Sequence, residues 1–353
     1  MDATLEYLKE LVDTHGTSGF EGEVYDVLAR RLKGYGEISK DRLGSFICEK
    51  KGAAGGPRVL LAGHLDEVGF MVKSITKEGY IKFLGLGGWW GHVVLGQRLI
   101  IRTRKGDVMG VVGSKPPHDL RDEDRRKVLE LREMFIDVGA TSDWDVRKKL
   151  DIQPGDSIVP DSKFTVMANP NLLLAKAWDN RIGCALATET MRALAKDKLP
   201  NTLIAAATVQ EEVGLRGAQT TAFKVKPDVA FALDVGIAHD TPGAEGEEKL
   251  GGGPLIEIYD ATVIPNPRLL NLVRDTAKKL KIEVQLESVE RGGTDAGRFH
   301  VSAEGVPSIA MGVPSRYIHS HNSIIDRRDF EQAVKLLTAV VKRLDRKTVD
   351  ALV

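Results

Sequence analysis

Acidic residues and histidines recur directly after apolar stretches of this 353-residue sequence. They are His64 and Asp66 after VLLAG, Asp179 after LLLAKAW, Glu211 and Glu212 after LIAAATVQ, Asp234 after VAFAL and His319 after VPSRYI. A short continuous apolar run predicts a buried strand, and open α/β sheets bind ligands where such strands end. Each residue alone has an ordinary explanation as a helix cap or loop residue. Their recurrence at strand ends favours one shared site.

The charges of these residues indicate what the site would hold. Buried carboxylates without counter-charge are very costly, so cations must accompany them. The carboxylates of Asp179, Glu212 and Asp234 supply three negative charges, and neutral His64 and His319 add none. Two divalent cations supply four positive charges, which leaves about one to stabilise a hydroxide, as in two-metal hydrolases. Mixed nitrogen and oxygen ligands favour zinc or cobalt over magnesium or calcium.

The elements that would position these residues follow an α/β pattern at both ends of the chain. Helices are predicted at 3–12, after Asp179, after Asn266 with Pro267 at the first helical position, and after Asp326. Ser18 and Glu21 have the spacing of a capping box that would open a second helix. Buried strands are predicted at 59–62, 201–211 and 227–236, and 282–289 alternates like an edge strand. The pattern predicts an α/β domain.

The middle of the chain differs. Short strand-like pieces alternate with glycines from about 69 to 160, as in a small β-barrel or sandwich. Within it, the segment DLRDEDRRKVLELRE is strongly charged and predicts a solvated helix or loop. The simplest organisation is an α/β domain interrupted by an inserted β domain.

Composition excludes several classes of function. Lysine plus arginine and aspartate plus glutamate both number 50, so no net field would attract nucleic acid or anionic lipid. Cys48 and Cys184 form no disulfide framework, and Cys184 is expected to be buried and inert. The N-terminal MDATLEYLKELV is not a signal-peptide pattern, and no apolar run is long enough to span a membrane. We therefore expect a cytoplasmic protein.

Six ordered motifs carry a resemblance to a known family. AGHLDEVG, AWDNRIG, TVQEEVGLRGA, ALDVG with DTPG, GGTDAG and RYIHS occur in the order typical of the deblocking or glutamyl aminopeptidases, di-metal peptidases of clan MH that include the tetrahedral TET enzymes. The resemblance runs from about residue 11 to the final helix. It implies hydrolysis of the N-terminal bond of short peptides.

The resemblance also implies a role for each candidate residue. His64 and Asp234 would bind the first metal, Glu212 and His319 the second, and Asp179 would bridge both. Asp66 would orient His64, and Glu211 would be the general base. His321 is expected to be a loop residue, and RGGTDAG a glycine loop near the substrate pocket. If the strand ends before the two glutamates, their neighbouring side chains can serve these different tasks.

The implied architecture is a phosphorylase/hydrolase-like three-layer catalytic domain formed by residues 1–67 and 162–353. Residues 68–161 would form the barrel-like insertion, which in relatives mediates dimerisation, and the dimers build a tetrahedral twelve-subunit shell. Other functions stay open: a deacylase or carboxypeptidase with the same metal centre, an endoglucanase using the paired acids, or a non-catalytic assembly protein that retains a structural site.

Overall fold

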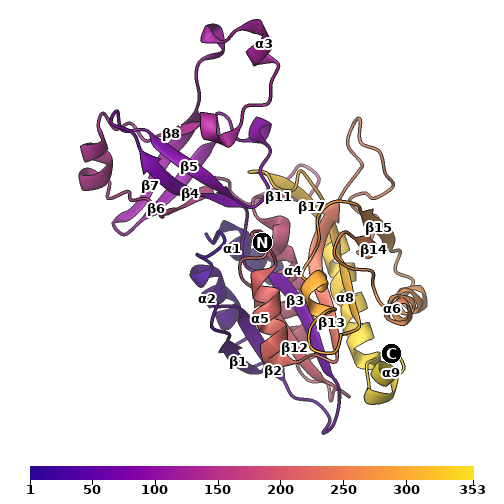
Figure 1. Cartoon of the computed structure of the whole chain (residues 1–353). Helices are drawn as coiled ribbons and strands as arrows, with labels where there is room; N and C mark the ends of the chain where they lie inside the picture. Colours follow the sequence, from indigo (N-terminus) through magenta and orange to yellow (C-terminus); the bar gives the residue numbers. More distant parts are fainter.

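The main body is built on an 11-stranded mixed sheet (Figure 1). The structure, a computed structural model, describes residues 1–353, the side chain of Pro117 excepted. The central strands β12, β3, β13 and β16 are parallel. The strands of the sheet are β1 (Glu37–Lys40), β2 (Phe46–Lys50), β3 (Arg58–His64), β10 (Thr165–Val166), β11 (Leu172–Ala175), β12 (Thr202–Thr208), β13 (Val229–Ile237), β14 (Leu255–Asp260), β15 (Gln285–Val289), β16 (Ser308–Arg316) and β17 (Ser323–Asp326).

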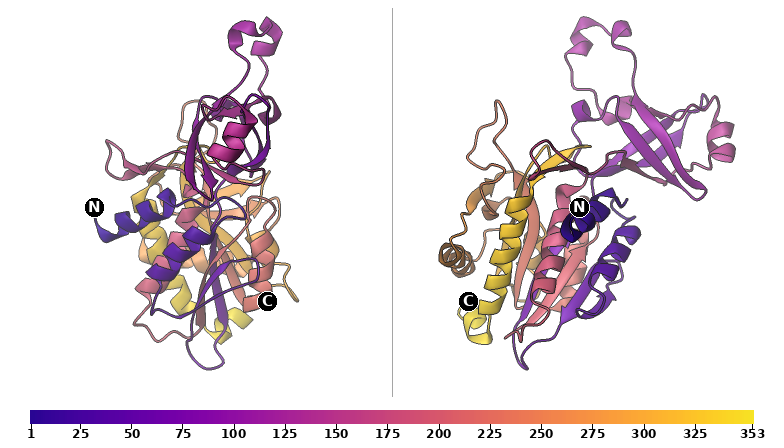
Figure 2. Two further views of the ribbon diagram at one scale, coloured as in Figure 1. Left: turned by 90° about the vertical axis from the view of Figure 1, so that its left-hand side faces the viewer. Right: turned by 180° about the vertical axis from the view of Figure 1, so that it is seen from behind.

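Helices cover both faces of this sheet and make three layers (Figure 2). Because successive strand residues point to opposite faces, Val59 and Leu61 of β3 join one core cluster, whereas Leu60 and Ala62 join the other. The larger cluster packs α1 (Ala3–Asp13), α2 (Gly22–Arg31), α4 (Trp178–Ala193), α6 (Pro267–Leu280), α8 (Arg327–Arg343) and α9 (Arg346–Asp350); the smaller packs α5 (Arg216–Val225) and α7 (Ala296–Phe299). The three-layer α/β prediction is confirmed.

The second body is a closed antiparallel barrel that projects from one end of the sheet (Figure 1). It has its own apolar core, separate from the two clusters above. Its strands are β4 (Gly69–Ile75), β5 (Ile81–Leu86), β6 (Arg98–Thr103), β7 (Gly106–Gly113), β8 (Phe135–Asp137) and β9 (Ser157–Pro160). The charged segment leaves the barrel as an exposed excursion around the short helix α3 (Asp122–Arg125), as the sequence predicts.

Most predicted helix boundaries hold, but the capping box is wrong. Asn266 caps α6 with Pro267 at the first helical position, as expected. The N-cap of α2 is Glu21, whose side chain makes no capping bond. Ser18 instead donates to Asp66 at 2.6 Å, and Glu21 accepts from the amides of Gly19 and Gln210. The hydrogen bond of Ser18 to the distant Asp66 therefore replaces the predicted local capping bond.

One strand end also differs from prediction. Strand β12 stops at Thr208 rather than at Glu211, so both glutamates lie in the turn that follows. Strand β13 ends at Ile237, within one residue of the predicted 227–236, because residues 230–237 stay paired with β16. Within α4, Asp179 has a non-helical backbone conformation, so it stands apart from the helix it was expected to start.

Candidate active site

The carboxyl ends of the parallel strands bring the predicted residues to one edge of the sheet. His64 ends β3, Asp234 lies in adjacent β13, and the glutamates follow β12 on the other side of β3. Asp179 follows β11, and His319 follows β16. All six line one cavity of about 440 Å³; they are His64, Asp179, Glu211, Glu212, Asp234 and His319.

Asp179 stands between the two histidines. Its Oδ1 lies 3.1 Å from Nε2 of His64, and its Oδ2 lies 3.2 Å from Nε2 of His319. Each of its oxygens thus faces a different imidazole. This is the geometry that a carboxylate shared by two neighbouring centres requires.

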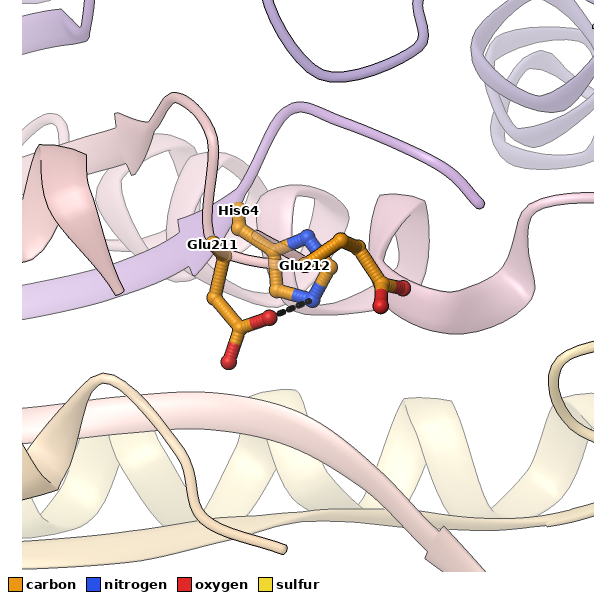
Figure 3. A group of neighbouring side chains, drawn as sticks. All are labelled: His64, Glu211 and Glu212. Carbon is orange, nitrogen blue, oxygen red and sulfur yellow. Dashed lines mark ion pairs between the residues drawn. The ribbon is translucent and has the colours of Figure 1, made fainter. Parts of the chain in front are cut away.

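The adjacent glutamates Glu211 and Glu212 point toward different histidines. Glu211 Oε2 lies 3.7 Å from Nε2 of His64, whereas Glu212 Oε2 lies 3.6 Å from Nε2 of His319. Figure 3 shows the two carboxylates on different sides of the His64 ring. Gln210 takes up a positive φ of 56° immediately before them, so the chain has left the strand and strand alternation no longer governs their directions.

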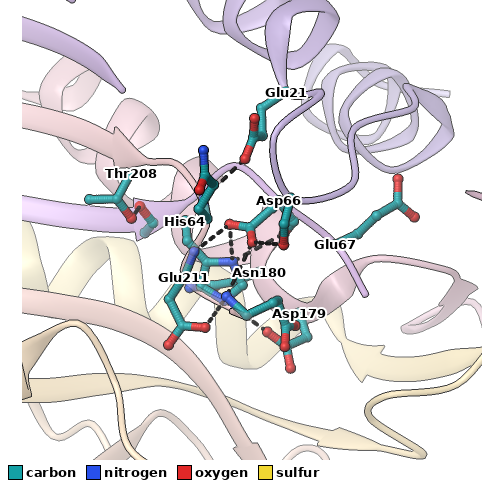
Figure 4. A network of polar contacts seen from close by, with 12 residues as sticks. Glu21, His64, Asp66, Glu67, Asp179, Asn180, Thr208 and Glu211 are labelled. Atoms are coloured by element: carbon teal, nitrogen blue, oxygen red, sulfur yellow. Dashed lines mark hydrogen bonds and ion pairs between the residues drawn. The ribbon is translucent and has the colours of Figure 1, made fainter. Parts of the chain in front are cut away.

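Asp66 is the central hydrogen-bond acceptor beneath the site (Figure 4). It is fully buried, and its Oδ1 lies 3.3 Å from Nδ1 of His64. The same carboxylate accepts the backbone amides of Glu211 and Glu212, at 3.0 and 3.1 Å, and the hydroxyl of Ser18. The carbonyl oxygen of Asp66 also lies 3.0 Å from Nδ1 of His64, so this one residue holds both the imidazole and the turn that presents the two glutamates.

The inserted barrel contributes to the second histidine. Nδ1 of His319 lies 2.9 Å from the carbonyl oxygen of Gly88, which belongs to the loop after β5. A Cβ on Gly88 would meet that nitrogen at 3.0 Å, and one on Gly87 would meet Glu212 Oε2 at 3.0 Å. The two glycines allow the loop to approach the site closely.

Burial of so many acids shifts their proton affinities. Burial, aided by Asp179, raises the pKa of Glu212 to about 8, and burial likewise raises that of Asp234 to about 8. Burial and nearby acids raise the pKa of Glu211 well above its usual range. For His319, burial opposes the charged form, but Asp179 and Glu212 outweigh it and raise the pKa to about 9. These four shifts all favour the protonated form of the group, as expected where carboxylates crowd together out of water.

The donor atoms fit divalent metal ions. Ligand atoms lie within 4.8 Å of one another in three groups, including His64 with Asp179 and Asp234, and Asp179 with Glu212 and His319. Oε1 of Glu212 is buried without a hydrogen-bond partner among the described residues. Imidazole nitrogens and carboxylate oxygens are donors that zinc and related ions accept.

Three acidic residues in or beside the cavity were missed at the sequence level. Asp295 is buried and accepts from the Thr208 hydroxyl at 2.5 Å, and its charge bears on Glu211. Glu257 and Glu287 line another part of the cavity. The GGTDAG motif could have indicated Asp295, whereas the two glutamates are hidden in strand sequences. The glycine loop does lie where expected, since residues 291–294 line the cavity.

The remaining predictions concern neighbouring residues. His321 lies in a loop as expected, but it is buried, against the edge of the Trp89 ring. Cys184 is also buried as expected; its Sγ donates to the carbonyl of His64, and burial raises its pKa to about 12. No described helix has the length and apolar character needed to cross a bilayer.

A three-layer α/β body with an inserted barrel and a His–carboxylate cluster at its strand ends defines the chain as a hydrolase of the metallopeptidase type. Comparisons with known proteins agree. The family model described as M42 glutamyl aminopeptidase matches residues 44–336, so the chain belongs to that family. Its members are metal-dependent peptidases, and this chain is an aminopeptidase-type peptidase.

Individual relatives cover almost the whole chain. The glutamyl aminopeptidase of Lactococcus lactis is 40% identical over 97% of both chains. A TET aminopeptidase from a marine sediment archaeon of the Thaumarchaeota has a TM-score of 0.97 and 46% identity, covering 100% of each chain. The TET1 peptidase of Pyrococcus horikoshii, which can assemble into a tetrahedron or a large octahedral shell, has a TM-score of 0.87 and 32% identity over 97% of this chain and 100% of that one.

Proposed function

We propose that this chain removes N-terminal residues from short peptides at a two-metal centre. His64, Asp179 and Asp234 would hold one ion, and Asp179, Glu212 and His319 the other. The observation that carries the proposal is Asp179, whose two oxygens face two different histidines within 3.2 Å. When bound, two such ions polarise a scissile carbonyl and lower the pKa of water.

The residues of the chain then divide the work. Glu211 accepts a proton from the attacking water at its carboxylate and passes it to the leaving amine, a role supported by its raised pKa and its place beside His64. Asp66 holds the Nδ1 side of His64 and the backbone of the glutamate turn. It acts by positioning, without contacting substrate.

Glycoside hydrolysis fits this geometry less well. Glu211 and Glu212 offer oxygens that lie within 4.8 Å of each other and of a His64 nitrogen. Paired acids of glycosidases instead flank a sugar at about 5–9.5 Å. A deacylase or carboxypeptidase remains the alternative that the same centre would serve.

The finer features of the proposal rest on the donor set and on the relatives. Zinc or cobalt suits the mixed nitrogen and oxygen donors. Residues 1–67 and 162–353 would act as the catalytic domain, and residues 68–161 as a dimerisation domain. By analogy with the TET peptidases, dimers would assemble into a tetrahedral dodecamer. The chain would work in the cytoplasm, on peptides rather than on nucleic acid or membranes.

The test is a substrate panel on metal-free protein with zinc or cobalt restored. We expect release of p-nitroaniline from aminoacyl anilides, little from their N-acetylated forms, and none from peptides with a free C-terminus only. Preference for the N-acetylated or C-terminal substrates would overturn the aminopeptidase assignment in favour of a deacylase or carboxypeptidase. Activity that needs no added metal after exhaustive chelation would overturn the metal centre.

A further inference from the structure

Two glutamates lie in the cavity outside the His–carboxylate cluster. Glu257 of β14 and Glu287 of β15 are register partners on neighbouring parallel strands. Both line the cavity, and they are only 6% and 2% exposed. Like charges placed directly opposite each other on adjacent strands destabilise a sheet. The fold therefore retains an unfavourable pair at this position.

The pair has no cationic partner among the described residues. Oε2 of Glu257 and Oε2 of Glu287 are both buried without a hydrogen-bond partner there. The other oxygen of Glu287 accepts the amide of Ile237 at 2.8 Å, which fixes its direction. Buried carboxyl groups are normally paired, so two unpartnered oxygens in one cavity leave a place for a donor from outside the chain.

The recess has the composition that a long cationic side chain would need. Besides the two acids, Val235, Ile237 and Val289 line the cavity. Lysine and arginine have apolar stems with charged ends, so apolar walls leading to an acidic end match them. Arg291 also lines the cavity, but it is exposed and can remain in water when substrate binds.

The recess belongs to the same cavity as the His–carboxylate cluster. Asp234 of the cluster lines that cavity together with Glu257 and Glu287. Asp234 is one of the cluster residues, so a peptide whose first carbonyl lies at the cluster can place its first side chain toward the two acids. A negatively charged side chain in the same place would instead be repelled by Asp234, Glu257 and Glu287.

We propose that Glu257 and Glu287 form the specificity recess for the first residue of the substrate, and that they select N-terminal lysine or arginine. The inference rests on the proposed aminopeptidase function, and it concerns which peptides that site accepts. The competing assignment is that the two acids bind the α-amino group, which every aminopeptidase substrate carries.

The experiment compares lysyl, norleucyl and glutamyl p-nitroanilides, because norleucine keeps the stem of lysine and lacks its charge. Wild-type metallated protein should favour lysyl over norleucyl substrate by about tenfold or more in kcat/KM. Glu257→Gln or Glu287→Gln should lower that ratio about tenfold and leave norleucyl turnover within about threefold. Glu290→Gln, an exposed neighbour outside the cavity lining, is the matched control and should keep the wild-type ratio.

Retained norleucyl turnover shows that each variant is folded. An equal loss on all three substrates would overturn the proposal in favour of α-amine binding, as would a wild-type preference for norleucyl or glutamyl substrate. If a variant fails to fold, the inhibition of wild-type protein by lysinol is compared with its inhibition by norleucinol. Stronger inhibition by lysinol supports the proposal, and equal inhibition overturns it. Absence of turnover on every anilide by wild type would instead refute the proposed function itself.

Discussion

The two histidines of the site are held in very different ways. His64 has a side chain only 2% exposed, ends a central strand, and is fixed by buried Asp66 of the same domain. The side chain of His319 is 37% exposed, lies in the loop after β16, and contacts the Gly88 carbonyl of the barrel. The sheet therefore preorganises one half of the centre, whereas the other half is completed by the insertion.

The largest effect should come from the glutamates, one beside each histidine. Glu211→Gln should lower kcat by about 10²–10⁴ and leave metal content intact, because the amide cannot accept the proton. Glu212→Gln should instead lose metal on the His319 side. The two variants are distinguished by measuring metal content with plasma emission spectroscopy and turnover with steady-state kinetics. Near-normal turnover by metallated Glu211→Gln would show that another group is the base.

The buried half should also bear most of the stability. Glu67 is 1% exposed and contacts Lys176 Nζ at 2.6 Å and Arg181 at 3.2 Å. Glu67→Ala leaves both cations buried without their carboxylate partner, so we expect the free energy of unfolding to fall by about 3–5 kcal/mol. Thermal melts measure the loss. The partly exposed pair of Arg346 and Asp228 is the control, since breaking it should cost about 0–1 kcal/mol.

Asp66→Asn tests positioning on the His64 side. The amide nitrogen cannot accept the backbone amide or the Ser18 hydroxyl that the carboxylate accepts, so His64 and the glutamate turn should both loosen. We expect metal affinity or activity to fall about 10–100-fold. A cobalt titration of the metal-free protein measures the affinity. Ser18→Ala removes one hydrogen-bond donor to Asp66 and should lower the affinity less. Equal effects of the two variants would assign the role to the hydroxyl contact.

The smallest effect is expected on the His319 side. Gly88→Ala places a methyl 3.0 Å from Nδ1 of His319, so the loop or the imidazole must shift. We expect one of two metal equivalents to bind about three- to tenfold more weakly, as seen by calorimetry. Gly22→Ala, where a Cβ meets open space, is the control. Equal weakening of both equivalents would contradict the division between the two halves.

The His64 half was largely predictable from sequence, because apolar runs mark parallel strands whose carboxyl ends must meet. Asp66, His64 and the two glutamates all follow from that rule. The contacts that distant segments make with the site were not predictable in this way. Gly88 reaches His319 across 231 positions, and no local pattern encodes that contact. Ser18 had a convincing local interpretation, which the buried Asp66 carboxylate overrode.

Glu257 and Glu287 show a different limit. Alternation predicted an edge strand at 282–289, and among the described strands β15 does pair only with β14. The pattern would place a glutamate at 287 in solvent, whereas the structure buries it in a cavity. Pairing partners in a sheet come from register between distant segments, which sequence periodicity does not contain.

The chain enters the barrel only five residues after His64, since β3 ends there and β4 begins at Gly69. The loop after β5 then returns to place Gly87 and Gly88 against Glu212 and His319. Substitutions that reshape the insertion must therefore keep this loop in place against the His–carboxylate cluster. In evolutionary terms, the surface of the barrel can diversify while its glycine loop cannot, so sequence drift within the insertion should be uneven.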